Sequence, residues 1–247
     1  GTEGMTGPDL ATSLALVDQL QQALGRNDRA RIVDAVRQLL RRRAPMGAQW
    51  QQVAYIVADQ GELGLSRQAM ALYVEASGGN PMAVYQQAGL LAQGGEVRAA
   101  FDLLETLPDN VPDPAVNAYS RGAAAVFIGE LEKARELLER AIILRPQLGQ
   151  AWLPLSTLVD FADGPALAER IVAGGSEMQK APAAARAPYY HALGKAYVDL
   201  GEQSLAFAAF ANGARLKKAE RPYDREADRA GGEEAVRGYD AATVSAM

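Results

Sequence analysis

A glycine recurs along this chain at intervals of 34 to 37 residues, and helical sequence patterns lie on both sides of it. The recurring glycines are Gly25, Gly61, Gly95, Gly129, Gly164 and Gly201. The segments 95–104 and 129–138 match each other, because each begins Gly-Glu, has Ala five residues after the Gly, and ends Leu-Leu. A period near 34 residues with helical patterning predicts stacked helical hairpins. Such hairpins bury their apolar faces against their neighbours and form a solenoid with an extended recognition surface.

The composition supports a packed helical protein and disfavours several partners. Of the 247 residues 49% are hydrophobic, and the formal net charge is −5. That balance provides no positive field, so we expect neither a nucleic-acid nor an anionic-membrane partner. The chain has no cysteine, which excludes disulfides and cysteine-based metal sites. No apolar run approaches the roughly 18 residues of a membrane span, and the first residues do not resemble a signal peptide. We therefore expect a cytoplasmic protein.

The segment 187–220 shows the repeat pattern most clearly. Seven of its residues stand at the positions 4, 7, 8, 11, 15, 20 and 24 that define a tetratricopeptide repeat, and they are Tyr190, Leu193, Gly194, Tyr197, Gly201, Ala206 and Phe210. Small residues at positions 8 and 20 let the two helices of a hairpin cross closely, while the larger ones fill the space around them. The chain therefore resembles the tetratricopeptide repeat family.

This resemblance implies an all-α, right-handed superhelical solenoid of about six helix-turn-helix hairpins with a C-terminal capping helix. The expected units are 11–44, 47–83, 84–114, 115–148, 149–186 and 187–220. We expect residues 1–10 to be a disordered start that includes a remnant of cloning, and residues 221–247 to be a cap or a linker to a further domain.

Two units deviate from the pattern. In the unit 47–83 the alanine expected at position 20 is matched only by Ala69, three residues late, so we expect a longer turn through Gly61–Gly64. In the unit 149–186 Asp163-Gly164-Pro165 interrupts the pattern, and we expect a loop from Gly174 to Ala187.

The last third of the repeat region is similar to bacterial proteins that join tetratricopeptide repeats to a sulfotransferase domain. The similarity is carried by Ala151-Trp152, Phe161, the segment from Tyr190 to Gly201, Ala206-Phe207, Asn212-Gly213 and Tyr223-Asp224. The family usually has Gly-Asn where this chain has Asn212-Gly213. The phosphosulfate-binding loop of such enzymes, which resembles Gly-x-Pro-Arg-Ser-Gly-Thr, does not occur in this sequence. The resemblance implies a recognition or regulatory region without the catalytic domain.

The sequence offers no catalytic constellation. His191 is the only histidine, so neither a triad nor a paired-histidine metal site can form. The pair Gly194-Lys195 lacks the surrounding residues of a phosphate-binding loop. We therefore predict a protein that is not an enzyme and that has no cofactor and no metal. The basic cluster Arg37, Arg41, Arg42 and Arg43 is expected at a helix C-terminus, where cations interact favourably with the exposed carbonyls.

The first helix of each repeat lines the inner surface of this fold at positions 2, 5, 9, 12 and 13. These positions predict a peptide-binding groove formed by Gln51, Tyr55, Asp59, Tyr85, Gln93, Tyr119, Phe127, Phe161, His191, Lys195 and Asp199. Aromatic side chains are common anchors at protein interfaces. The carboxylate clamp of Lys, Asn and Arg found in chaperone-tail receptors of this fold is absent. We expect a module that binds a peptide or partner protein in this groove. The alternative is the recognition or regulatory region of a sulfotransferase.

Overall fold

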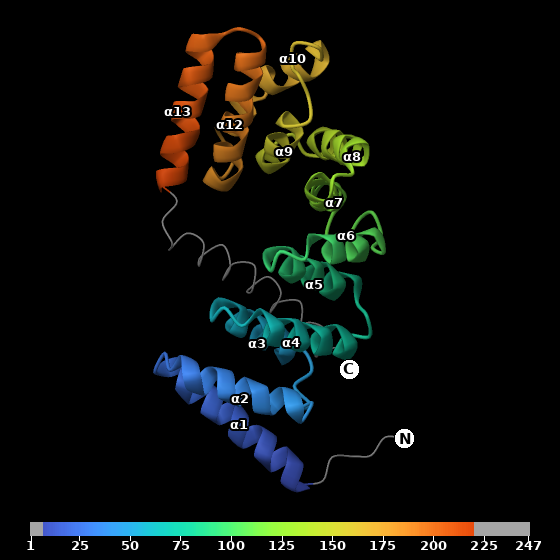
Figure 1. The fold of residues 1–247 in the computed structure, drawn as a ribbon, viewed down its shortest axis with the longest axis vertical. Helices are drawn as coiled ribbons and strands as arrows, with labels where there is room; N and C mark the ends of the chain where they lie inside the picture. The colour runs from blue at the N-terminus through green and yellow to red at the C-terminus, as the bar shows by residue number, and fades with distance from the viewer. Residues whose placement is uncertain (1–6, 220–247) are drawn as a thin grey trace. The chain divides into compact units, whose positions relative to one another are not determined.

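The computed structural model describes residues 7–219, and all regular secondary structure within them is helical (Figure 1). The chain divides into two compact units, residues 1–129 and 130–247. The division falls inside the predicted repeat 115–148. The first unit contains α1 (Gly7–Gly25), α2 (Arg29–Arg41), α3 (Gln49–Asp59), α4 (Leu63–Ala76), α5 (Pro81–Gln93), α6 (Val97–Glu105) and α7 (Pro114–Ile128).

Consecutive helices of the first unit pack as hairpins. Helix α1 packs on α2, α3 on α4 and α5 on α6, and the hairpins stack through α2 with α3, α4 with α5 and α6 with α7. One core runs through the first two hairpins and includes Val36, Leu39 and Val57, which are fully buried. The Trp50 indole Nε1 also donates to the Ala44 carbonyl oxygen at 3.2 Å. The prediction of an all-α solenoid of helical hairpins is confirmed.

Small buried residues stand where the two helices of a hairpin cross. Ala54 and Ser66 occupy these positions in α3 and α4, and Ala88 and Ala100 occupy them in α5 and α6. All four side chains are at most 2% exposed. Because a larger side chain would separate the helices, the packing of each hairpin depends on these residues.

The turns inside the hairpins repeat with a constant spacing. Asn27, Gly61, Gly95 and Gly129 all have positive φ angles, between 51° and 84°, and they follow one another at intervals of 34 residues. The prediction that Gly25 is the turn residue of the first hairpin is wrong, since Gly25 ends α1. Asparagine tolerates the left-handed conformation because its short polar side chain can form hydrogen bonds with nearby groups. A repeat defined by glycine alone therefore does not include Asn27.

The predicted longer turn after Gly61 does not exist. Helix α4 begins at Leu63, two residues after Gly61, just as α6 begins at Val97, two residues after Gly95. Ser66, rather than Ala69, is the small residue five positions after the turn glycine, and it is 2% exposed. A buried serine fits the space of an alanine. Because the expected pattern required an alanine, the position of this helix was predicted three residues too late.

Several helices begin earlier than predicted. Helix α1 begins at Gly7, so residues 7–10 are helical rather than disordered. Helix α5 begins at Pro81 instead of residue 84, because the Asn80 side chain accepts from the Met82 backbone N–H at 2.9 Å and proline suits a first helical turn. Residues 1–6 and 220–247, which hold the predicted cloning remnant and the predicted cap, lie outside the described residues.

The second unit contains α8 (Leu131–Leu144), η1 (Gly149–Ala151), α9 (Trp152–Ser156), α10 (Pro165–Ala173), α11 (Gly175–Met178), α12 (Ala183–Asp199) and α13 (Gln203–Ala219). Of the predicted interruption, Asp163 and Gly164 precede α10, and Pro165 is its first residue. The predicted loop from Gly174 to Ala187 is wrong, since it contains α11 and the first turn of α12. Met178 in α11 is buried, so this segment contributes to the core of the second unit.

Tyr189 connects α12 to α10. Its ring is fully buried, and its hydroxyl donates to the Ile171 carbonyl oxygen at the end of α10. Burial raises the pKa of Tyr189, and the neighbouring tyrosines Tyr190 and Tyr197 raise it further. The phenol therefore remains a neutral hydrogen-bond donor at physiological pH.

Gly149 lies at a close backbone approach in the second unit. A Cβ at this position would lie 2.0 Å from the Ala185 carbonyl oxygen and 2.7 Å from the Met178 Cε atom. Only glycine therefore lets η1 lie against α12 at this distance.

Gly149→Ala is expected to lower the free energy of unfolding by about 3 kcal/mol, because backbone has to move to admit the methyl group. Urea denaturation followed by circular dichroism measures this change. The control is Gly164→Ala, where the nearest atom to an added Cβ is 3.8 Å away. Equal stabilities for the two variants would contradict the close packing of η1 on α12.

The turn assignment gives a second prediction. Asn27→Ala should lower the free energy of unfolding by about 1 kcal/mol, because alanine pays the full steric cost of the left-handed conformation. Asn27→Gly should keep or raise the stability. Gly25→Ala should be neutral or stabilising, because an added Cβ there meets no atom within 4 Å. Thermal melts of the three variants decide between Asn27 and Gly25 as the turn residue.

Candidate peptide-binding site

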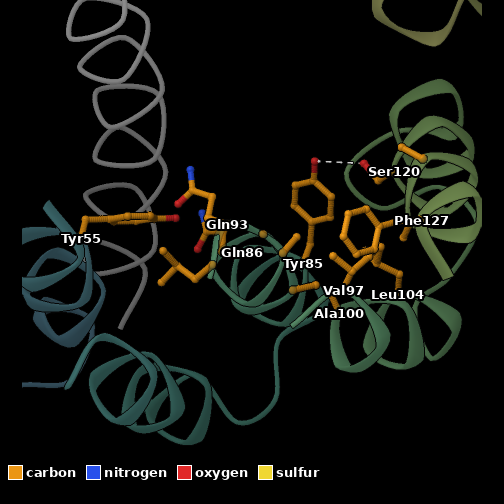
Figure 2. A pocket seen from close by; sticks show the side chains of 15 residues that line it. Tyr55, Tyr85, Gln86, Gln93, Val97, Ala100, Leu104, Ser120 and Phe127 are labelled. Carbon is orange, nitrogen blue, oxygen red and sulfur yellow. Dashed lines mark hydrogen bonds between the residues drawn. The ribbon is translucent and has the colours of Figure 1, made fainter. Parts of the chain in front are cut away.

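A pocket of about 440 Å³ lies in the first unit among α3, α5, α6 and α7 (Figure 2). Its lining consists of aromatic, aliphatic and uncharged polar residues, namely Tyr55, Tyr85, Gln86, Ala88, Gly89, Leu90, Ala92, Gln93, Val97, Ala100, Leu104, Ser120, Ala123, Ala124 and Phe127. This volume is within the range of about 300 to 1,000 Å³ that ligand-binding pockets occupy.

Helical spacing brings these side chains to one place. Tyr85, Gly89 and Gln93 follow one another at four-residue intervals on α5, so they share one face of the helix. Ser120, Ala123 and Phe127 lie at intervals of three and four on α7, and they share a face in the same way. The lining residues of α5 and α7 between the aromatic rings are mostly alanine or glycine, so the space between them stays open.

Aromatic rings border the open space. Figure 2 shows Tyr85 and Phe127 beside each other on one side of the pocket and Tyr55 on the other. The Tyr85 hydroxyl and the Ser120 Oγ lie 3.4 Å apart, a hydrogen bond that joins α5 to α7. The Phe127 side chain is 73% exposed although it is large and apolar. Its position at the end of α7, next to an apolar hollow, makes it available to a partner.

The polar groups of the site are neutral. The Gln51 Nε2 donates to the Gln86 Oε1 at 2.7 Å, which connects α3 to α5. Gln93 is exposed at the end of α5. Tyr119, half-buried on α7, is not among the lining residues, and burial raises its pKa, as does the nearby Tyr85. Asp59 is exposed at the end of α3 and is likewise not part of the lining.

Three predicted groove residues of the second unit contact each other instead. Phe161 is fully buried, so the prediction that it lines a groove is wrong. The Lys195 ammonium lies 5.5 Å from the centre of the Phe161 ring and donates to the Val159 carbonyl oxygen and to Asp199. Asp199 in turn accepts from the Phe161 backbone N–H at 3.1 Å. Lys195 and Asp199 therefore hold the segment 159–161 against α12.

His191 packs against α13. Its ring centre is 6.3 Å from that of Phe210, and ring atoms come within 3.1 Å of the place where a Cβ on Gly213 would lie. This half-buried histidine therefore supports the last hairpin, and it is not among the residues that line the pocket.

The sequence analysis missed part of the site. Gln86, Ser120, Val97 and Leu104 line the pocket but were not predicted, because the repeat positions selected only the first helix of each hairpin at five fixed places. Gln86 directly follows Tyr85, and Ser120 lies two helical turns before Phe127 on the same face of α7. These spacings could have indicated both residues from the sequence. Val97 and Leu104 belong to α6, whose contribution requires the structure.

The basic cluster is where the sequence placed it. Helix α2 ends at Arg41, and the Arg43 guanidinium pairs with the Glu75 carboxylate at 2.7 Å. Within residues 7–219 no group of acidic, histidine or cysteine side chains is arranged to hold a metal ion. In the same part of the chain, no helix combines the length and apolar character that crossing a membrane requires.

Comparisons with known proteins identify the fold. No family model matches the sequence, and no curated protein matches it. Among solved structures, a tetratricopeptide repeat protein from Parabacteroides merdae is similar with a TM-score of 0.58 and 16% identity, over 86% of this chain and 81% of that protein. MamA from Desulfovibrio magneticus has a TM-score of 0.51 and 17% identity, over 69% and 94%. A further MamA structure has a TM-score of 0.50 and 20% identity, over 67% and 94%.

The hairpins, the 34-residue turn spacing and these similarities define the class of the protein. It has the fold of tetratricopeptide repeat proteins. At these identities the comparisons concern the fold, and the site has to be interpreted from its own residues.

Two predicted groove aromatics give a matched test of the site. Phe161→Ala should lower the free energy of unfolding by about 3 to 5 kcal/mol, because it empties a fully buried site. Phe127→Ala should change stability by less than about 0.5 kcal/mol, because its ring is exposed. Denaturant titrations of the two variants measure the difference. A large loss for Phe127→Ala would mean that this ring is part of the core and not a binding surface.

Proposed function

We propose that this protein is a non-catalytic interaction module that binds a peptide segment of a partner protein in the pocket between α3, α5, α6 and α7. The observation that carries the proposal is the exposed Phe127 ring beside the Tyr85 ring at the edge of an apolar hollow. Tetratricopeptide repeat arrays present extended concave surfaces for protein and peptide partners, which supports the same function.

The physical basis of binding is the removal of apolar surface from water. A partner side chain that enters the hollow covers the Phe127 and Tyr85 rings, and burial of apolar surface contributes about 25 cal/mol per Å². Aromatic anchors next to small residues are typical of the few positions that dominate binding energy at an interface. Of the eleven predicted groove residues, Tyr55, Tyr85, Gln93 and Phe127 line this pocket.

The second function, the recognition region of a sulfotransferase, rests on the sequence resemblance of the last third of the repeats. None of the solved structures named above is described as a sulfotransferase. Lys195 and Asp199, two residues within the similar segment, contact the segment 159–161. Packing within the second unit thus explains why two residues of the similar segment are present. The interaction module is therefore the function that we put forward.

A displayed library of random 16-residue peptides, selected on the full chain, tests the proposal. Synthetic copies of the selected peptides should bind Tyr85→Ala and Phe127→Ala at least about tenfold more weakly than the original protein, because truncating an aromatic anchor costs more than about 1 kcal/mol. Fluorescence anisotropy gives the dissociation constants.

Asp102→Ala is the matched control, since Asp102 is exposed on α6 and does not line the pocket. Its affinity should equal that of the original protein. Selected peptides that bind both aromatic variants with unchanged affinity would show that the pocket is not the binding surface.

A further inference from the structure

Among residues 7–219, no charged side chain lines the pocket. None of its fifteen lining residues is Asp, Glu, Lys, Arg or His, although 22% of the chain is Asp, Glu, Lys or Arg. The polar atoms that face the pocket belong to tyrosine, glutamine and serine, which are neutral at physiological pH. A partner therefore meets a surface that offers hydrogen bonds but no counter-charge.

Two arginines of the first unit are paired with carboxylates. Arg67 on α4 pairs with Glu96, which precedes α6. The Arg121 guanidinium on α7 pairs with the Glu105 carboxylate of α6 at 2.9 Å, and its side chain is only 15% exposed. These ion pairs leave neither Arg67 nor Arg121 as an unpaired counter-charge for a partner. A charged partner side chain that entered the hollow would lose its hydration without gaining an opposite charge, and that is strongly unfavourable.

The amides at the pocket match the backbone of an extended peptide. Figure 2 shows the amide groups of Gln86 and Gln93 on the side of the pocket that faces Tyr55. A glutamine amide both donates and accepts hydrogen bonds, as each peptide unit of an extended chain does. The Gln86 Oε1 already accepts from the Gln51 Nε2, so Gln86 offers mainly its amide N–H groups to a partner. A helical partner already uses its backbone groups internally and gains less from these two side chains.

We infer that the occupant of this pocket is an extended, uncharged segment of a partner protein that inserts one bulky apolar side chain, of the leucine, methionine or phenylalanine kind, into the hollow against the rings of Tyr85 and Phe127. This inference rests on the proposed function and specifies the chemistry of the partner. The segment carries no charge at the inserted position or at its immediate neighbours.

Gly89 provides the means to block the hollow without disturbing the fold. A Cβ added at Gly89 meets no atom within 4 Å, and Gly89 lies in the middle of α5 with an ordinary helical backbone. A leucine at this position therefore projects into the pocket, and it also favours the helix over glycine. Gly89→Ala favours the helix in the same way but leaves most of the hollow open.

The experiment uses the peptides selected on the full chain by library display. Each peptide is resynthesised with its apolar anchor replaced by norleucine, glutamate or lysine, and dissociation constants are measured at 50 and 500 mM NaCl. Norleucine should retain affinity, whereas glutamate and lysine should each weaken binding at least about tenfold. Affinity should change less than about twofold between the two salt concentrations, because no ion pair forms.

The variants complete the test. Gly89→Leu should weaken binding at least tenfold with an unchanged or raised melting temperature, and Gly89→Ala should bind like the original protein. Peptides that depend on Tyr85 and Phe127 but tolerate glutamate or lysine as anchor, or that bind Gly89→Leu normally, would overturn this inference and leave the proposed function intact. Peptides that do not depend on the two aromatic residues would overturn both. If no peptide binds and the chain self-associates through a contact that Gly89→Leu removes, the occupant is a second copy and the inference fails.

Discussion

Close crossing of paired helices at small residues is the constraint on which the rest of the structure depends. Ala54 and Ser66 are buried in one hairpin, and Ala88 and Ala100 are buried at the equivalent positions of the next. In the last hairpin a Cβ added to Gly194 would lie 2.6 Å from the Phe210 ring. Small side chains let the two helices approach closely, so these positions set the geometry of the three hairpins.

Small side chains also line the binding pocket, where they leave an open space at the surface. Within the hairpins, larger side chains from neighbouring helices fill the space around the small residues. At the pocket, Gly89, Ala92, Ala123 and Ala124 line a space that no side chain of residues 7–219 fills. The aromatic rings of Tyr85 and Phe127 stand at its edge, so an apolar side chain of a partner can complete the packing that a neighbouring helix completes elsewhere.

The fold could be predicted from the sequence because the repeat imposes the same physical requirement several times. Where a different residue met that requirement, the prediction failed: Asn27 took the left-handed turn and Ser66 took the small buried position. The site was harder to predict. Repeat positions found Tyr55, Tyr85, Gln93 and Phe127, but they also selected Phe161, whose burial depends on how the segment after the short helix α9 folds back. Such irregular packing leaves no periodic signal.

The polar contacts along the pocket have a consequence for how the chain tolerates changes in length. Gln51 bonds to Gln86, and Tyr85 bonds to Ser120, and in both pairs the partners lie 35 residues apart. Because the turns repeat every 34 residues, both contacts tie a residue to the one directly after its counterpart in the following repeat. An inserted or deleted residue in the turns at Gly61 or Gly95 would leave each helix intact but move these partners out of alignment. The two hydrogen bonds therefore form only when the repeats keep their length. In this way the repeat length is coupled to the shape of the binding surface.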